Sequence, residues 1–396
     1  MEIRSEEANA MAREYQVIST DDHIIEPHGM FDGRLPKEFA ERTPKLIETE
    51  GSAAWHVDGV VGPDGSPHAV EMSGLSTAAG QKVEEFSPKS KTFDAMRKGC
   101  YDPAERLKDM DIDGVDAQVC FPTLPGLAGI TFIEIADKPF AAALIKAYND
   151  WLIEEWCAPD RERLLGAAIL PLWDMQESAD ELRRVAAAGL KCISLPSTPG
   201  SVEGVPGFHD PSWAPVWDAM SETGLPAEIH IVSGKADVSA LGGLGVGAEI
   251  FVALAPSTNM QTVAVLLFSG ILRKWPKLKF ISAESGIGWL PYFIERADYA
   301  HRKHRFWTGS NIDVMPSDLF RQSIYANFIS DRAGVEGRHM IGVDNIMIGT
   351  DYPHTDSSWP DTQRVIKEQM GDISQEDRDK ILWRNAARVF QLNGSK

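Results

Sequence analysis

Five side chains that can bind a divalent cation stand at the ends of short apolar runs spread over most of the chain. Imidazoles and carboxylates are ligands that Zn²⁺, Mn²⁺ and Fe²⁺ accept in proteins. A turn or a helical stretch follows each of them, as expected where a strand ends and a loop begins. The five residues are Asp21, His23, His230, Glu284 and Asp351.

Asp21 and His23 are separated by one residue in a predicted strand. Alternate residues of a strand point to the same face, so both side chains can reach one ion. Taken singly, the pair also fits a hydrogen-bonded Asp beside a surface His, and a lone His230 at a strand end is more often satisfied by a backbone carbonyl. The combination of all five residues is what predicts a metal site.

Asp351 follows an apolar run and precedes Tyr352, Pro353 and His354. A carboxylate here can bind the cation, take a proton from a cation-bound water, or do both in turn. Capping of the next turn is the structural alternative. His354 could relay a proton or polarise a carbonyl, or make a simple loop hydrogen bond. We expect catalytic roles for Asp351, His354 and Glu284, the last as a ligand or a proton carrier.

Eight apolar runs predict the strands that position these residues, and segments of helical periodicity separate most of them. Such an order favours right-handed crossovers and a parallel sheet closed into a distorted (β/α)₈ barrel of the TIM type. The strand ends of a barrel meet at one mouth, so distant residues can converge there. The predicted strands cover residues 15–18 (leading into 19–23), 115–121, 164–172, 192–195, 227–232, 278–283, 323–329 and 345–348. The predicted helices cover residues 103–110, 139–156, 178–188, 213–222, 261–273, 289–297 and 375–390.

Residues 31–98 lack clear periodicity and are rich in Gly, Ser, Pro and charge, with one short hairpin arm predicted at residues 55–59. A segment of this length predicts an inserted lid or interface element after the first strand. We expect one domain over residues 1–396 that carries this insertion. We also expect a homodimer in which the insertion contributes to the interface.

Composition limits the classes of partner. The formal net charge of −19 argues against nucleic acid or an anionic membrane as a general partner, and we expect a small-molecule substrate. A basic run at residues 301–305 could meet an anionic group or a neighbouring subunit, although a solvated face is the commoner role. Residues 1–14 lack an apolar leader segment, and no run is apolar enough to span a bilayer, so we expect a cytoplasmic location.

The cysteines form no pattern typical of a metal or redox motif. Four residues are scattered along the chain without a CxxC pair, which fits small buried side chains in a reducing compartment. They are Cys100, Cys120, Cys157 and Cys192.

Several residues are candidates for substrate binding. Glu26 follows His23 by three positions and could be an extra ligand, a substrate contact or a turn anchor. Aromatic and amide side chains near strand ends could line the pocket or pack in the core, and the insertion and the glycine-rich residues 234–247 would set specificity. The further candidates are Trp289, Tyr325, Asn327 and Trp359.

From about residue 17 to residue 390 the chain resembles the amidohydrolase-2 family. This branch of the amidohydrolase superfamily includes aminocarboxymuconate-semialdehyde decarboxylase and several aromatic-acid decarboxylases. The resemblance is carried by the motifs STDDHIIEP at 19–27, YDP at 101–103, MDIDGVD at 110–116, AESGIGW at 283–289 and GTDYPH at 349–354.

The resemblance implies a distorted (β/α)₈ barrel whose metal is held by Asp21, His23, His230 and Asp351. Many members have His or Glu where this chain has Asp21, and many have His where it has Glu284. Both changes favour an oxygen-preferring ion such as Mn²⁺ or Fe²⁺, with Zn²⁺ still possible. We expect one ion rather than two, because Lys191 precedes its strand and cannot supply the bridging lysine of other branches.

The expected activity is hydrolysis. Asp351 would deprotonate a cation-bound water, which would attack the carbonyl of an amide, ester, thioester or C–C substrate. The alternative is decarboxylation of an aromatic or enoic acid, with Asp351 or His354 as the acid. By analogy, Glu284 in place of the strand-6 His favours hydrolysis. A barrel that binds metal or ligand without chemistry is the third hypothesis.

Overall fold

Eight parallel strands close into a barrel in the computed structural model, which describes residues 13–62, 65–234, 246–308, 310 and 313–392. This confirms the predicted fold. Residues 1–12 and 235–245, which carry most of the predicted leader-free N-terminus and of the glycine-rich segment, lie outside the described residues. The barrel follows the order β1 (Ile18–His23), β11 (Ile346–Ile348), β10 (Ile324–Phe328), β9 (Phe280–Ala283), β8 (Ala227–His230), β7 (Cys192–Pro196), β6 (Leu164–Ala168), β5 (Ala117–Phe121).

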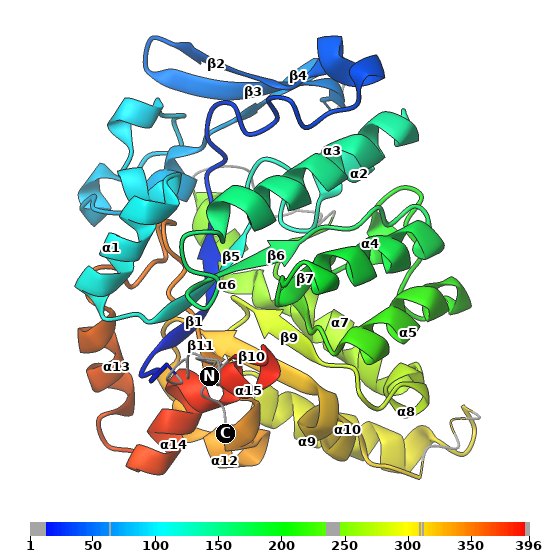
Figure 1. Ribbon diagram of the computed structural model, residues 1–396. Helices are drawn as coiled ribbons and strands as arrows, with labels where there is room; N and C mark the ends of the chain where they lie inside the picture. The colour runs from blue at the N-terminus through cyan, green and yellow to red at the C-terminus, as the bar shows by residue number, and fades with distance from the viewer. Residues whose placement is uncertain (1–12, 63–64, 235–245, 309, 311–312, 393–396) are drawn as a thin grey trace, which may run out of the picture.

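Helices surround the barrel (Figure 1). Most lie where helical periodicity predicts them, and α1 shows why. Asp102 accepts hydrogen bonds from the N–H groups of Ala104 and Glu105, Pro103 starts the helix, and Gly114 ends it with φ 70°. The helices are α1 Pro103–Asp113, α2 Ile130–Ile133, α3 Lys138–Trp151, α4 Met175–Ala187, α5 Ala214–Thr223, α6 Val246–Leu254, α7 Pro256–Phe268, α8 Ile271–Lys274, α9 Leu290–His304, α10 Pro316–Ser323, α11 Arg332–Glu336, α12 Arg338–Ile341, α13 Thr362–Met370, α14 Gln375–Asp379 and α15 Asn385–Val389.

The interior of the barrel is a closed apolar core. Inward side chains of the strands pack against the end of the chain, where α15 and the residues after it cover the barrel floor (Figure 1). Fully burying one large apolar side chain contributes about 1.5–3 kcal/mol. The core includes Ile18, Val119, Leu165, Ile281, Met347, Ala387 and Phe390.

Tyr325 belongs to this interior core, and its prediction as a pocket-wall residue is wrong. It is 3% exposed, and Arg388 on α15 donates to its hydroxyl at 3.4 Å. Tyr325 is the second residue of β10, whereas the mouth lies beyond the last residue, Phe328. The apolar run identified the strand correctly. The prediction failed because Tyr325 lies near the start of β10, at the end of the barrel away from the mouth.

The insertion after β1 contains a three-stranded antiparallel sheet, seen at the top of Figure 1, where the sequence predicted only one hairpin arm. Its strands are β2 Lys45–Thr49, β3 Ser52–Val61 and β4 Pro67–Glu71. Beyond the sheet, the N–H groups of Ala78 and Ala79 donate to the Pro353 carbonyl, and Thr355 N–H donates to the Leu75 carbonyl. The insertion is therefore anchored to the loop after β11, which carries Asp351. A lid or interface role for it stays a prediction.

All four cysteines are buried and free, which confirms the prediction of small buried side chains. None of the helices in the described part of the chain combines the length and apolar character that a bilayer span requires.

Candidate metal centre

The five predicted ligands come together at the carboxyl ends of the barrel strands. Asp21 and His23 lie in the last half of β1, and His230 is the last residue of β8. Glu284 directly follows β9, and Asp351 lies three residues beyond β11. Because parallel strands of a barrel end at one mouth, residues more than three hundred positions apart become neighbours.

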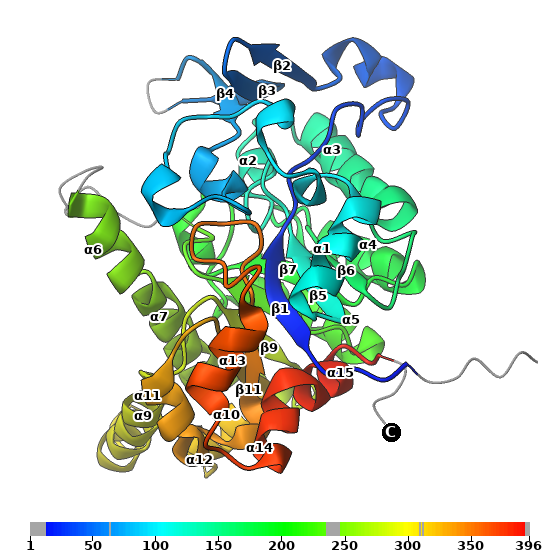
Figure 2. The same ribbon diagram turned by 90° about the vertical axis from the view of Figure 1, so that its left-hand side faces the viewer.

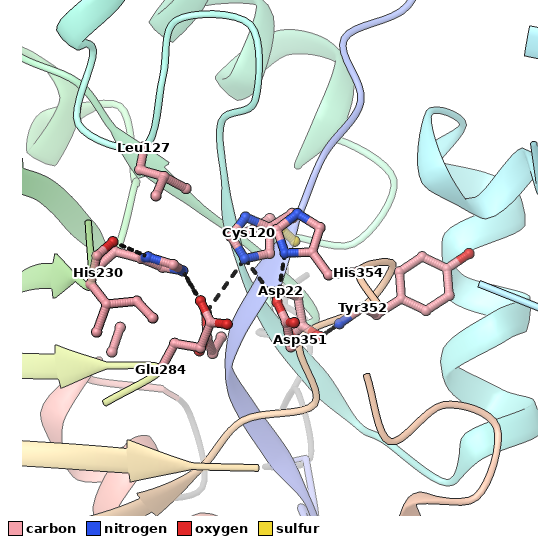
Figure 3. Close-up of polar contacts among 12 residues, drawn as sticks. Asp22, Cys120, Leu127, His230, Glu284, Asp351, Tyr352 and His354 are labelled. Carbon is pink, nitrogen blue, oxygen red and sulfur yellow. Dashed lines mark hydrogen bonds and ion pairs between the residues drawn. The ribbon is translucent and has the colours of Figure 1, made fainter. Parts of the chain in front are cut away.

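Two imidazoles connect the carboxylates into one cluster. His23 Nε2 lies 3.0 Å from Asp351 Oδ1 and 3.7 Å from Asp21 Oδ1. His230 Nε2 lies 3.4 Å from Asp21 Oδ1 and 3.0 Å from Glu284 Oε2. Figure 3 shows Glu284 pointing toward His230 on one side, with Asp351 and His354 on the other.

The polar atoms of the cluster match the needs of a cation. Both carboxylate oxygens of Asp21 and of Asp351, with Nε2 of His23 and of His230, are buried, and the only ion-pair partners found for them in the described part of the chain are members of the same cluster. Unsatisfied buried polar atoms are costly, and a cation with oxygen and nitrogen ligands would satisfy this set. His230 Nδ1 lies 2.9 Å from the Ile231 carbonyl oxygen, so Nδ1 carries the hydrogen and Nε2 keeps its lone pair.

His354 extends the cluster on the Asp351 side. Its Nδ1 lies 2.9 Å from Asp351 Oδ1, and its ring stacks on His23 with centroids 3.7 Å apart. Ligand atoms of Asp21, His23 and His230 lie within 4.8 Å of one another, and so do those of His23, Asp351 and His354. Both triads contain His23, which favours one shared centre.

Burial and mutual charge shift the pKa values of the cluster. Burial raises the pKa of Asp21 to about 7, although His230 opposes the shift. Burial lowers the pKa of His23 well below its usual value, and the neighbouring His354 and His230 add to this effect. Burial also disfavours the charged form of His230, but Asp21 and Glu284 outweigh it and raise its pKa. Protons therefore compete with a cation for these atoms.

Two of these acidic residues adopt left-handed backbone, with φ 54° at Glu284 and φ 51° at Asp351. This conformation costs a non-glycine residue about 1–2 kcal/mol, so neighbours must hold it. Glu284 N–H donates to Asn327 Oδ1 at 2.7 Å, and Asp351 N–H donates to the Asp21 carbonyl at 2.7 Å. Asn327, a predicted substrate contact, is fully buried and positions Glu284.

A network around Asp22 and Arg106 also positions the ligands, and the sequence interpretation missed it. Asp22 Oδ1 accepts from the Tyr352 N–H at 3.1 Å and from the Thr350 hydroxyl, which ties β1 to the loop carrying Asp351. The buried Arg106 donates to the His23 carbonyl at 2.6 Å. The place of Asp22 between two predicted ligands was a usable signal, whereas no local pattern marks Arg106.

The family model described as amidohydrolase matches residues 55–392. The chain belongs to the amidohydrolase family. This confirms the resemblance drawn from the motifs.

Curated relatives of this amidohydrolase include decarboxylases. The 2-amino-3-carboxymuconate-6-semialdehyde decarboxylase of Dictyostelium discoideum is 24% identical over 310 residues, covering 77% of this chain and 81% of the relative. The gamma-resorcylate decarboxylase of a Polaromonas species is 25% identical over 315 residues, covering 73% of this chain and 87% of the relative. The matching relatives are decarboxylases, so they support the alternative activity rather than hydrolysis.

Solved structures show the same fold. An amidohydrolase from Mycobacterium avium subsp. paratuberculosis matches with TM-score 0.73 and 23% identity, over 97% of this chain and all of that one. A Polaromonas dihydroxybenzoic acid decarboxylase with bound manganese and 2-nitroresorcinol matches with TM-score 0.60 and 23% identity, over 75% of this chain and 88% of that one. Manganese in that neighbour agrees with the predicted divalent-metal cofactor.

The remaining site predictions have different outcomes. Glu26 accepts from the N–H groups of Thr123 and Leu124 at 2.9 and 2.8 Å, which is the turn-anchor alternative. Trp289 donates to the Ser285 carbonyl at 3.0 Å, and Trp359 donates to the Asp109 carbonyl at 3.0 Å. Substrate contact by Glu26 or either tryptophan stays a prediction.

The basic run lies at the end of α9, away from the metal ligands along the chain. His301 is buried there, whereas Arg302, Lys303 and His304 are exposed. This matches the solvated face that we considered its commoner role.

Proposed function

We propose that this amidohydrolase is a divalent-metal-dependent decarboxylase of a small aromatic or enoic carboxylic acid. The observation that carries the proposal is the convergence of buried candidate ligand atoms from Asp21, His23, His230 and Asp351, in a chain whose curated relatives are named decarboxylases. This reverses the order predicted from the sequence, in which hydrolysis stood first.

The four converging residues would hold the cation, and Glu284 would be a further ligand or a proton carrier. A bound divalent cation supplies a Lewis acid that can hold the substrate carboxylate and an adjacent oxygen. Anchoring of the insertion to Pro353 brings residues 75–79 beside the barrel mouth.

His354 and Asp351 would move the proton. Their Nδ1 and Oδ1 atoms are 2.9 Å apart, so one proton can be shared between them. Transfer of that proton to the substrate carbon that bears the carboxylate allows the C–C bond to break. The bonding electrons return to the substrate π system, and CO₂ leaves. One proton is consumed for each CO₂ formed.

Hydrolysis remains the second candidate because of Glu284. Its Oε2 lies 3.0 Å from His230 Nε2. The resemblance implies that many family members carry a histidine at the position of Glu284. A carboxylate in this place can accept a proton from water as readily as it can bind a cation. The two candidate functions therefore use the same site differently: a decarboxylase would activate the substrate carboxylic acid, and a hydrolase would activate water.

Product analysis separates the two. Metal-loaded protein would be incubated in D₂O with hydroxybenzoates, enoic acids, amides, esters and thioesters. A decarboxylase releases CO₂ and places one deuterium at the former carboxyl carbon, whereas a hydrolase releases an acid without CO₂. Release of an acid without CO₂ would contradict the proposal. No product from any substrate would favour a binding protein. Asp351→Asn, checked for folding by circular dichroism, is the matched inactive control.

A further inference from the structure

The two imidazoles of the metal centre are held in different ways. His230 Nδ1 lies 2.9 Å from the Ile231 carbonyl oxygen, and this hydrogen bond fixes its ring. A metal-binding histidine almost always has such a partner for its second ring nitrogen. His23 Nδ1 is buried, and no hydrogen-bond partner is found for it among the described residues. A different kind of contact must therefore hold the His23 ring in the orientation that the site needs.

Phe121, the last residue of β5, contacts both imidazole rings. Its ring centroid lies 5.6 Å from that of His23, with the two planes tilted by 32°. It lies 5.0 Å from that of His230, edge to face with an angle of 74° between the planes. Both distances are typical of favourable contacts between aromatic rings. One fully buried apolar ring therefore contacts ligands from β1 and β8, which are not neighbours in the barrel.

The backbone holds Phe121 beside His23. β1 and β5 run side by side (Figure 2), and His23 is the direct partner of Phe121 in their register. The Ile24 N–H donates to the Phe121 carbonyl at 2.9 Å. Glu26 then accepts from two N–H groups of the loop that follows Phe121, at 2.9 and 2.8 Å. The two strand ends are thus tied together on both sides of the ring contact.

His354 is the other ring that packs on His23, with centroids 3.7 Å apart. Its side chain is 20% exposed, and the proposed mechanism uses it to move a proton to the substrate. Phe121 has no polar side-chain atom and is fully buried, so it takes no part in proton transfer. Of the two rings, Phe121 is the one that can stay in place throughout the reaction.

We propose that Phe121 is a positioning residue of the metal centre, and that its ring does for His23 what a hydrogen bond does for His230. The inference rests on the proposed function only in that both imidazoles bind a cation. Ligands whose rotamers are locked by their surroundings hold a metal in the required geometry. Loss of the Phe121 ring should loosen His23 more than His230, because His230 keeps its contact with the Ile231 carbonyl.

Phe121→Leu removes the ring and keeps a buried apolar side chain. Phe328→Leu is the matched control, because Phe328 is also fully buried and also ends a barrel strand, β10. No ring contact between Phe328 and a histidine is found in the described part of the chain. Competition with a chelator should show Mn²⁺ affinity at least about tenfold weaker in Phe121→Leu and within about threefold of wild type in Phe328→Leu. Equal losses in the two variants, or no loss in Phe121→Leu, would overturn the proposal.

Histidine NMR of the metal-free, full-length chain tests the same inference without a bound ion. With ¹³C at histidine Cε1, the His23 signal of the wild type should report one rigid ring orientation. In Phe121→Leu the His23 signal should broaden or average, and the His230 signal should change less. The variants His23→Gln and His230→Gln assign the two signals. An unchanged His23 signal, or equal changes at both rings, would count against Phe121 as the positioning residue.

Failure of this inference can be told apart from failure of the proposed function. A wild type that binds no Mn²⁺ contradicts the metal-dependent function, whereas the NMR comparison of His23 with His230 still decides the role of Phe121. If Phe121→Leu does not fold, Phe121→Met replaces it in both experiments, because the flexible Met side chain fills irregular space without an aromatic ring. The same outcomes then support or overturn the proposal.

Discussion

At the scale of single residues, the centre depends on three carboxylates held close together around shared imidazoles. Asp21, Asp351 and Glu284 all face the two imidazoles of His23 and His230. Three negative charges in a buried site need a compensating cation, because unpaired buried charge is expensive. Each carboxylate is therefore expected to matter more for metal retention than for folding.

Asp351→Asn tests this expectation. The substitution keeps the shape of the side chain but removes its charge and its shared proton with His354. We expect the bound metal, measured by mass spectrometry, to fall below one ion per chain. Product formation should fall at least about 100-fold, as typical for loss of a group that moves a proton. Unchanged metal content together with unchanged turnover would remove Asp351 from the centre.

Glu26→Gln tests a buried acid outside the cluster. Burial raises the pKa of Glu26 to about 7 from its usual 4.5. The folded protein then holds a proton that the unfolded chain has lost between these pH values, so stability falls as pH rises through that window. The free energy of unfolding of wild type should therefore fall from pH 4.5 to pH 8, whereas that of the variant should not. The difference between variant and wild type should grow by on the order of 3 kcal/mol over this range. Denaturant unfolding at both pH values measures it, and a pH-independent difference would contradict the assignment.

At the scale of elements, the ends of neighbouring strands hold the ligands in place. Asn327 on β10 links Glu284 after β9 to the Thr20 carbonyl of β1, to which its Nδ2 donates at 3.0 Å. Asp22 on β1 in turn holds the loop after β11. The ligand positions therefore depend on the relative placement of four strands rather than on one rigid segment.

Gly349→Ala tests the close contact between the end of β11 and Asp21 on β1. A methyl group at residue 349 would lie 2.7 Å from Cβ of Asp21, which forces β1 and the end of β11 apart. We expect a loss of about 1–3 kcal/mol in stability and at least a tenfold weaker metal affinity, measured by competition with a chelator. Gly200→Ala is the control, because its nearest neighbour would lie at an ordinary 3.6 Å. Equal metal affinity in both variants would show that Asp21 has room to move.

Asn327→Ala tests the support of Glu284. Without the amide oxygen, the Glu284 N–H loses its acceptor while the backbone stays left-handed at φ 54°. A buried donor left unsatisfied costs about 1–3 kcal/mol. Thermal unfolding should show this loss, and Asn327→Asp, which retains an acceptor for that N–H, should recover part of it. No recovery would assign the effect to the Thr20 contact instead.

At the scale of the whole molecule, the sequence was sufficient to predict the barrel and the convergence of the five candidate ligands at its mouth. Apolar runs followed by polar residues mark the strand ends. In a closed parallel barrel these ends meet at one mouth, which brings the polar residues together. Other features depend on contacts that no local pattern encodes. The three-stranded sheet of the insertion depends on the pairing of β3 with two largely exposed five-residue strands, β2 and β4. Tyr325 is buried because of its depth in β10. Arg106 has a role only because the fold brings it to the His23 carbonyl.

Metal removal tests how far the centre stabilises the molecule. Ligands from β1, β8 and β11 would be tied together by one ion, which binds the folded state alone. Chelation should lower the Tm, and Mn²⁺ at a hundred times its Kd should restore about 2.7 kcal/mol of unfolding free energy. Differential scanning calorimetry of the stripped and reloaded protein measures the difference. An unchanged Tm would mean that the ion binds a preformed site too weakly to matter for folding.

The first barrel strand pairs with the last, with Ser19 beside Ile348, and α15 then covers the barrel floor. During synthesis, β1 can pair early with β5, but its second neighbour, β11, is made only after most of the polypeptide. The cation site is consequently among the last parts of the native protein to be assembled. Nascent chains halted ahead of Ile346 should be unable to capture Mn²⁺, so metal uptake would report completion of the barrel.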